Sequence, residues 1–199
     1  MIARLRQLGE LAGRCAVELD GPVSAYADLV RKAVRSGHTL MWAGNGGSAA
    51  HAQHIATEYV IRYRPVQRRA IAALALSTDS SILTAGGNDL GYDAVFERQV
   101  EALGREGDLL VLVSTSGNSP NLLRAAGMAK RKAMTTVGLL ARGGGKLAEL
   151  VDLAVVVPTD DTALAQEIQL AIDHHVCDVI EQEVGRELAP LPPRPPAVP

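Results

Sequence analysis

The sequence predicts a doubly wound α/β fold, with a parallel five-stranded sheet between layers of helices. Short apolar runs that are typical of buried strands alternate along the chain with longer segments of helical character. This alternation indicates βαβ units, in which a crossover helix returns the chain to begin the next parallel strand. The length of 199 residues and the hydrophobic content of 47% fit one domain with one good core.

The predicted strands share a short apolar run, and several contain β-branched residues. They cover residues 38–44, 70–76, 108–114, 135–140 and 153–158. The helices predicted between them cover residues 48–63, 80–86, 92–104, 119–132 and 144–151. Two further helices are expected near 2–20 and 23–36, and a long one near 161–186. Because one sheet does not need so many helices for cover, we expect the N-terminal helices within 1–36 to contribute to contacts between subunits.

The predicted domain covers residues 1–187, and a short tail follows it. Residues 188–199, LAPLPPRPPAVP, are rich in proline, which cannot continue a helix. We therefore expect this tail to be exposed and extended or disordered.

Charge and composition exclude several classes of partner. The formal net charge is −2 and there is no long basic run, so neither nucleic acid nor an anionic membrane is expected as a partner. Cys15 and Cys177 lack metal-ligand spacing and are expected to be free thiols. No stretch has the length and apolar character of a membrane span, and no export signal is recognised, so a cytoplasmic location is expected.

The first candidate loop, GNGGS at 44–48, follows the first predicted strand. Its glycines permit positive φ and close approach of a ligand, and Ser48 could cap the next helix. Ala49 stands where a dinucleotide fingerprint requires its third glycine, and no lysine of a Walker loop is present, so no nucleotide cofactor is expected. These residues alone leave a ligand loop and a simple strand-to-helix turn equally open.

The second candidate loop, STSGNSPN at 114–121, follows the third predicted strand and carries a cluster of hydroxyls. The hydroxyl residues are Ser114, Thr115, Ser116 and Ser119. Pro120 suits the first position of a helix, and Ser119 suits its N-cap. Free N–H groups and the helix dipole both favour an anion here, so this loop is predicted to bind phosphate.

Two helices carry the candidate chemical groups. On the helix that follows GNGGS, His51, His54 and Glu58 share one face, with Arg62 one turn further on.

On the last predicted helix, Gln166 and His174 are eight residues apart, or about 80° around the axis. His175 falls on the opposite side from Gln166, so His174 is the better partner of Gln166 in one site.

These motifs resemble the phosphoheptose isomerases of the sugar isomerase (SIS) superfamily. The resemblance rests on GNGGSAAHAQHIATEY, TAGGNDLGYDAVFERQVEALGREGD, STSGNSPNLLRAA, GGKLAELVD and QEIQLAIDHH, in this order, between about residues 38 and 184. It implies an SIS fold, a homotetramer with active sites between subunits, and an aldose–ketose isomerase. The implied reaction converts sedoheptulose 7-phosphate to D-glycero-D-manno-heptose 7-phosphate, the entry to bacterial heptose for surface glycans.

The resemblance also implies roles for individual residues. Glu58 and His174 match the acid–base pair of the family. Zinc is held in some members by residues that match His54, Glu58, Gln166 and His174, although an amide is an unusual zinc ligand. Substrate contacts are implied for Asn45, Gly46, Gly47, Ser48, Glu58, Arg62, Asn88, Asp89, Ser114, Thr115, Ser116, Ser119 and Gln166.

One residue departs from the family pattern, and two other functions stay open. The family often carries an arginine two residues before the QE pair, where this chain has Leu164. Substrate preference is therefore less firmly implied than the fold. Some related SIS proteins bind the replication initiator DnaA without catalysis, and other SIS enzymes isomerise different sugar phosphates. The presence of both Glu58 and His174 favours an enzyme.

Overall fold

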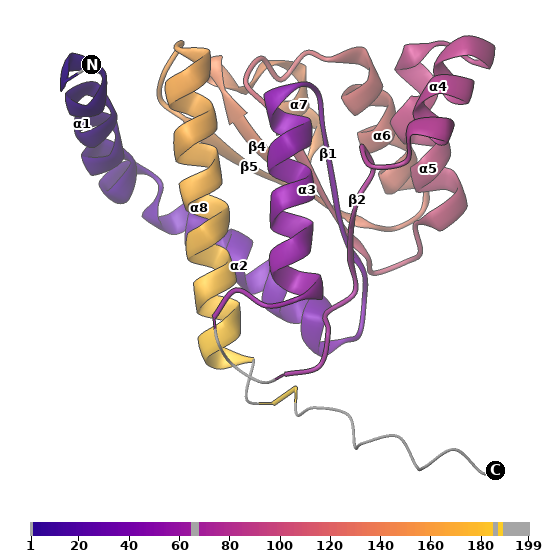
Figure 1. The fold of residues 1–199 in the computed structure, drawn as a ribbon, viewed down its shortest axis with the longest axis horizontal. Coiled ribbons are helices and arrows are strands. Elements are labelled where there is room, and N and C mark those ends of the chain that lie inside the picture. The colour runs from indigo at the N-terminus through magenta and orange to yellow at the C-terminus, as the bar shows by residue number, and fades with distance from the viewer. Residues whose placement is uncertain (1, 65–67, 185–186, 189–199) are drawn as a thin grey trace.

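The computed structural model describes residues 2–64, 68–184 and 187–188. Its elements are α1 (Ile2–Glu18), α2 (Asp20–Arg35), β1 (Leu40–Gly44), α3 (Gly47–Val60), β2 (Ala73–Ala75), α4 (Ser80–Asp89), η1 (Tyr92–Ala94), α5 (Val95–Leu103), β3 (Leu109–Ser114), α6 (Pro120–Arg131), β4 (Thr135–Ala141), η2 (Arg142–Gly144), α7 (Gly145–Leu150), β5 (Leu153–Val157) and α8 (Thr162–Glu183). Within this part of the chain, all five strands are parallel and lie in the order β2-β1-β3-β4-β5. The predicted fold class is confirmed (Figure 1).

The sheet is covered on both faces, as its uninterrupted apolar strands predict. Along β3, Leu109, Val111 and Val113 pack into one apolar cluster with α2, α3 and α8. The alternate residues Leu110 and Leu112 pack into a second cluster with α5, α6 and α7. Successive side chains of a strand point to opposite faces, so one strand contributes to both clusters.

Strand β2 is shorter than predicted and lies at the edge of the sheet. It spans Ala73–Ala75, whereas the sequence predicted residues 70–76. The flanking residues still form single backbone hydrogen bonds, since Leu40 N–H donates to Ala72 and Leu76 N–H donates to Trp42. An edge strand has a partner on one side only, so the regular ladder ends sooner than the apolar pattern does.

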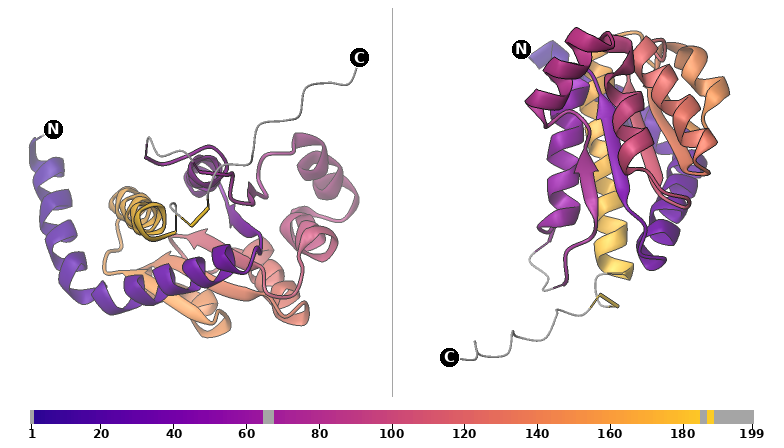
Figure 2. Two further views of the ribbon diagram at one scale, coloured as in Figure 1. Left: turned by 90° about the horizontal axis from the view of Figure 1, so that it is seen from below. Right: turned by 90° about the vertical axis from the view of Figure 1, so that its right-hand side faces the viewer.

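The N-terminal helices meet at Leu19, and α2 begins at Asp20, earlier than predicted. Pro22 is tolerated in the first helical turn because its missing N–H would have no partner there. Helix α1 lies at the outer edge of the molecule, away from the sheet (Figure 2). Its Arg4 guanidinium donates to both carboxylate oxygens of Asp161, at 2.7 and 2.9 Å, and thereby joins α1 to the start of α8.

The chain end differs in part from the prediction. Leu188, assigned to the tail, is buried in the first apolar cluster, and its carbonyl accepts a hydrogen bond from Arg69 N–H. The rest of the predicted tail, 189–199, lies outside the described residues, as do residues 185–186 at the end of the predicted last helix. Among the described helices, none combines the length and hydropathy that crossing a membrane requires.

The sheet order places the two candidate loops side by side. The chain runs from β1 outward to β2 and then returns to the other side of β1 with β3, so the order reverses between β1 and β3. Gly44 at the end of β1 is in register with Val113 near the end of β3. Ligands of open α/β sheets bind at such a reversal, beyond the carboxyl ends of the strands.

Candidate functional site

The loop after β1 turns directly into α3. Gly46 adopts a φ of +56° and occupies the N-cap position, so the helix begins at Gly47. Ser48 is therefore inside the first turn and is buried, with no side-chain capping bond. The expected capping role of Ser48 is wrong, because the positive φ of Gly46 lets the helix start two residues earlier.

Asn45 in this loop is held by two side chains that the sequence analysis did not single out. Its amide exchanges two hydrogen bonds with the buried amide of Asn121, at 3.0 and 2.9 Å. Tyr92 also donates its hydroxyl proton to Asn45 Oδ1, at 3.0 Å. Asn121 directly follows Pro120, so its place in the first turn of α6 was the available signal. The contacts fix Asn45 between the ends of β1 and β3.

The loop after β3 has the hydroxyls and the helix start that the sequence predicted. Pro120 is the first residue of α6, and Ser119 is its N-cap without a side-chain capping bond. The Ser114 hydroxyl oxygen accepts from Gly117 N–H, and the Ser116 hydroxyl oxygen accepts from Asn118 N–H. Each of these two hydroxyls accepts through its oxygen and keeps its own proton to donate.

The neighbouring residues 146–147 support this loop. Asn118 Oδ1 accepts from Lys146 N–H at 3.1 Å, and the Gly117 carbonyl accepts from Leu147 N–H at 2.9 Å. The loop is therefore bound to the start of α7 as well as to its own helix. An anion site built on it would be rigid before a ligand arrives.

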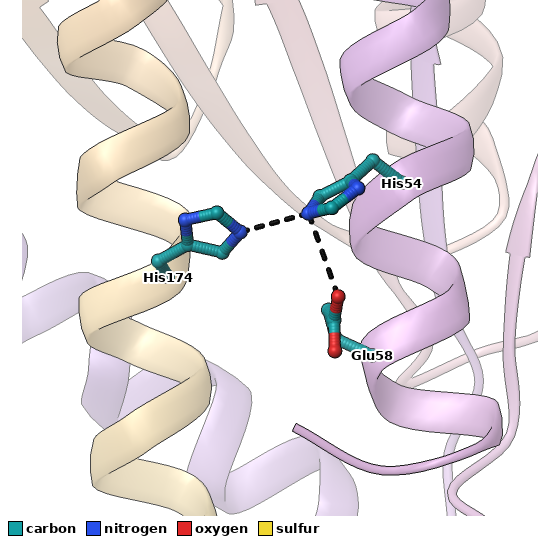
Figure 3. Close-up of side chains that lie close together, drawn as sticks. All are labelled: His54, Glu58 and His174. Atoms are coloured by element: carbon teal, nitrogen blue, oxygen red, sulfur yellow. Dashed lines mark hydrogen bonds and ion pairs between the residues drawn. The ribbon is translucent and has the colours of Figure 1, made fainter. Parts of the chain in front are cut away.

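A second group of polar side chains lies between α3 and α8. His54 and Glu58 from α3 face His174 from α8, as Figure 3 shows. His54 Nε2 lies 2.8 Å from His174 Nε2 and 3.4 Å from Glu58 Oε1. Glu58 is mostly buried and His54 is half exposed. The structure therefore brings together three of the four predicted metal-site residues across two helices distant in sequence.

The electrostatic environment of this triad, His54, Glu58 and His174, favours a neutral His174. Burial lowers the pKa of His174 below the ordinary histidine value, and the neighbouring His54 lowers it further, while Glu58 opposes the shift. A neutral imidazole keeps a lone pair for accepting a proton or binding a metal. One of the two facing rings must donate the proton between the Nε2 atoms and the other must accept it.

The donor atoms of the triad also fit a metal ion. One ligand atom from each of the three residues lies within 4.8 Å of the others. Two imidazole nitrogens and a carboxylate oxygen form a set common in zinc sites, and three protein ligands leave a coordination position open. The triad can therefore hold a metal ion.

His51, which is on the same helix as His54 and Glu58, lies outside the triad and has a different partner. Its Nε2 is 2.7 Å from Asp173 Oδ2, and Tyr26 donates to the other oxygen of Asp173 at 2.6 Å. All three side chains are buried. The bonds join α2, α3 and α8 one turn from the triad. His175 is exposed and lines a groove on the opposite side of α8, as predicted.

Gln166 and Leu164 lie near the start of α8. The Gln166 amide packs against Gly47, since a Cβ on that glycine would stand 2.7 Å from Gln166 Nε2. Gln166 thus faces the start of α3, and its place among the metal-site residues stays a prediction. Leu164, in the place of the family arginine, is buried in the core.

Three further predicted residues, Arg62, Asn88 and Asp89, are exposed. Helix α3 ends at Val60, so Arg62 does not continue the helical face of Glu58, and that part of the prediction is wrong. Asn88 and Asp89 end α4 and are hydrogen-bonded to each other at 2.7 Å. Tyr63, which the sequence analysis did not select, lies with its ring 5.6 Å from that of His174.

Comparisons with known proteins agree with this arrangement. Residues 5–141 match the SIS domain family. The chain is 46% identical over 182 residues to the phosphoheptose isomerase of Geobacter sulfurreducens, covering 92% of this chain and 96% of the relative. It is 54% identical over 177 residues to that of Pelobacter propionicus, covering 89% and 92%.

Solved structures give the same result. The phosphoheptose isomerase of Neisseria gonorrhoeae superposes with a TM-score of 0.85 at 38% identity, covering 91% of this chain and 96% of that one. The enzyme of Francisella tularensis superposes with a TM-score of 0.87 at 30% identity, with the same coverage. Because both the identity and the coverage are high, the chain belongs to the phosphoheptose isomerases of the SIS domain family.

Proposed function

We propose that the chain is an aldose–ketose isomerase that interconverts sedoheptulose 7-phosphate and D-glycero-D-manno-heptose 7-phosphate. The observation that carries the proposal is the meeting of Glu58 and His174 between α3 and α8, in a chain 46% identical to a phosphoheptose isomerase along nearly its whole length. The reaction would open bacterial heptose synthesis, and the substrate is a small sugar phosphate. Two buried free thiols are consistent with a cytoplasmic enzyme.

The chemistry needs one group that removes a proton and one that returns it. A base takes the proton from the carbon next to the carbonyl, which gives an enediol, and an acid returns a proton to the neighbouring carbon. Glu58 and His174 come from facing helices and can divide these two steps, with each well-placed group contributing about 10²–10⁴-fold. Their roles exchange when the reaction runs in the opposite direction.

The substrate phosphate would bind the loop at 114–119. Ser114, Thr115, Ser116 and Ser119 supply hydroxyls, and the N-terminus of α6 supplies free N–H groups. Asn45, Gly46, Gly47 and Ser48 would line the sugar, together with Gln166. Arg62, Asn88 and Asp89 are exposed at positions where they could contact a substrate, including one bound to a neighbouring subunit.

The proposed metal is zinc, held by His54, Glu58 and His174, with Gln166 as the fourth ligand. When bound, zinc would polarise the substrate carbonyl or fix Glu58 and His174 in place.

We expect His54→Ala to abolish tight zinc binding in a titration of the metal-free protein, because it removes an imidazole ligand. His175→Ala should bind zinc as the parent does, since His175 lies on the other side of α8. Equal zinc affinity in all three proteins would refute the ligand assignment.

The proposed assembly is a homotetramer with active sites between subunits. A groove of about 350 Å³ runs between α1, α2 and α8 and is lined mainly by apolar side chains. Ile2, Leu5 and Val17 of α1 are 65–80% exposed. Apolar surface of this kind favours burial against another subunit.

Sedimentation of the active protein should therefore give four times the chain mass of 21.0 kDa. Leu5→Glu should shift the protein toward smaller species, because it places a charge on the α1 surface. Full activity in a 21.0 kDa monomer would contradict the assembly.

The proposed reaction is tested by turnover of sedoheptulose 7-phosphate, followed by separation of the heptose phosphates. Aldoheptose phosphate should form and the reverse reaction should occur. Aminosugar and hexulose phosphates serve as competing substrates, because another sugar phosphate is the nearest alternative. No turnover of any of these, with binding to an initiator protein instead, would support a non-catalytic role.

A further inference from the structure

Arg68 is a buried arginine in the segment between α3 and β2. Only 1% of its side chain is exposed, and its Nε donates to Glu181 Oε2 at 2.6 Å. The Glu181 side chain is 3% exposed, so the ion pair is almost completely removed from water. Removing two charges from water costs free energy that their attraction does not always recover, so a buried ion pair is weak evidence for a role in stability. The Arg68–Glu181 pair therefore needs another explanation.

The same guanidinium binds the end of α3, at the backbone of Glu58. Arg68 Nη2 donates to the Glu58 carbonyl and Nη1 donates to the Tyr59 carbonyl, both at 2.9 Å. The last carbonyls of a helix have no partner within the helix, and a cation near them is favoured by the helix dipole. Arg68 therefore supplies donors and charge where α3 ends.

Glu181 extends this connection to α8. It lies seven residues, or about two turns, beyond His174 on the same helix. One guanidinium thus binds the backbone of Glu58 and a side chain of the helix that carries His174. At the other end of the triad, His51 and Asp173 form a second buried contact between α3 and α8, which run side by side (Figure 1).

We infer that Arg68 is a positioning residue, which holds Glu58 at its working distance from His174 through the carbonyl of Glu58 and the carboxylate of Glu181. This inference rests on the proposed function of Glu58 and His174. A planar guanidinium with several fixed donors can bind two carbonyls and a carboxylate together, whereas an ammonium acts as a point charge. Small displacements of catalytic groups are costly, and loss of an outer contact can lower activity or metal affinity by about 10–100-fold.

Three variants test the inference, and two of them, Arg68→Lys and the double variant, leave no unpaired buried charge. Arg68→Lys keeps the charge opposite Glu181 but loses the fork that binds the α3 carbonyls. Glu181→Gln keeps an acceptor for Arg68 and leaves the carbonyl contacts in place. The double variant Arg68→Met with Glu181→Met removes both charges together. Arg35→Met is the matched control, because it breaks an exposed arginine–glutamate pair with Glu187 that does not involve α3.

The expected result is a separation of kcat from KM. Arg68→Lys and the double variant should lower kcat about tenfold or more, with KM changed less than about threefold, because the phosphate loop lies on other elements. Zinc affinity of the metal-free protein should fall about tenfold in the same two variants. Glu181→Gln should lower kcat less than Arg68→Lys does, because the guanidinium keeps its contacts with the α3 carbonyls, and Arg35→Met should stay within about threefold of the parent in kcat.

The melting temperature of each variant is measured together with its kcat, to distinguish a positioning role of Arg68 from a purely structural one. If Arg68 serves stability alone, folded Arg68→Lys will keep the parent kcat and zinc affinity below its melting temperature, which would overturn the inference. Parent protein that binds zinc but does not turn over the sugar would refute the proposed function, and zinc affinity would still decide the role of Arg68. Parent protein that does neither would refute both.

Discussion

Glu58→Gln and His174→Gln are each expected to lower kcat for sedoheptulose 7-phosphate by roughly 10²-fold or more. Glu58→Gln keeps the shape of the side chain but removes the basic oxygen. His174→Gln removes a ring whose pKa is lowered by burial and by His54, and which is therefore neutral and able to accept a proton near pH 7. Steady-state kinetics on the folded variants measures both losses.

Substrate binding should largely survive these changes. The proposed phosphate loop lies on β3 and α6, whereas Glu58 and His174 lie on α3 and α8. Calorimetry should therefore detect sugar phosphate binding to both variants.

His175→Gln is the matched control, since it changes a histidine adjacent in sequence that faces the groove beside α1 and α2. Its kcat should equal that of the parent. Parent-like turnover by Glu58→Gln would instead refute the acid–base assignment.

The fold could be predicted from the sequence because its signals are local. Each strand is a short apolar run, and residues 108–114 were enough to locate β3 at Leu109–Ser114. Pro120 marked the first residue of α6, because its fixed φ suits that position. The strand order was not predicted, because it depends on which strands pair across the sheet.

Part of the candidate site could be predicted from helical periodicity, which indicates which side chains share one face of a helix. The spacing of His54 and Glu58 on one helix, and the choice of His174 over His175 on another, follow from 3.6 residues per turn. Helical periodicity gave the wrong position for Arg62, because the predicted helix continued past Val60, where α3 ends. A helix end depends on contacts with the following chain, here including those of Arg68 with the final carbonyls.

Contacts between segments distant in sequence could not be predicted from one sequence. His51 and Asp173 are 122 residues apart, and nothing local indicates that they form a buried pair. Asn121 and Tyr92 likewise meet Asn45 only because β1 and β3 are neighbours in the sheet. Such contacts can be predicted only when the packing of the helices and strands is known. They lie around the candidate site residues, which the sequence motifs did indicate.

Gly117→Ala is expected to weaken sugar phosphate binding by roughly 10²-fold, which corresponds to the loss of one or two hydrogen bonds to a charged group at about 1.5–3 kcal/mol each. Gly117 adopts a φ of +62°, where a residue with a Cβ is strained. A Cβ there would stand 1.8 Å from the Gly144 carbonyl oxygen, so the backbone at 114–119 or at 143–145 must move. Such movement would disturb the Gly117 N–H bond to Ser114 and the hydroxyls proposed to bind the phosphate.

Gly143→Ala is the control, because it has the strain of a positive φ without the collision that a Cβ on Gly117 makes with Gly144. Gly143 has a φ of +72° and lies in the adjoining turn, but a Cβ on it would meet nothing within 4 Å. It should therefore lose only about 1–2 kcal/mol of unfolding free energy and bind the substrate as the parent does. Calorimetric titration with sedoheptulose 7-phosphate, beside thermal unfolding of both variants, measures the difference. If Gly117→Ala bound as tightly as Gly143→Ala, the phosphate would have to bind elsewhere, because the collision cannot leave the loop at 114–119 unchanged.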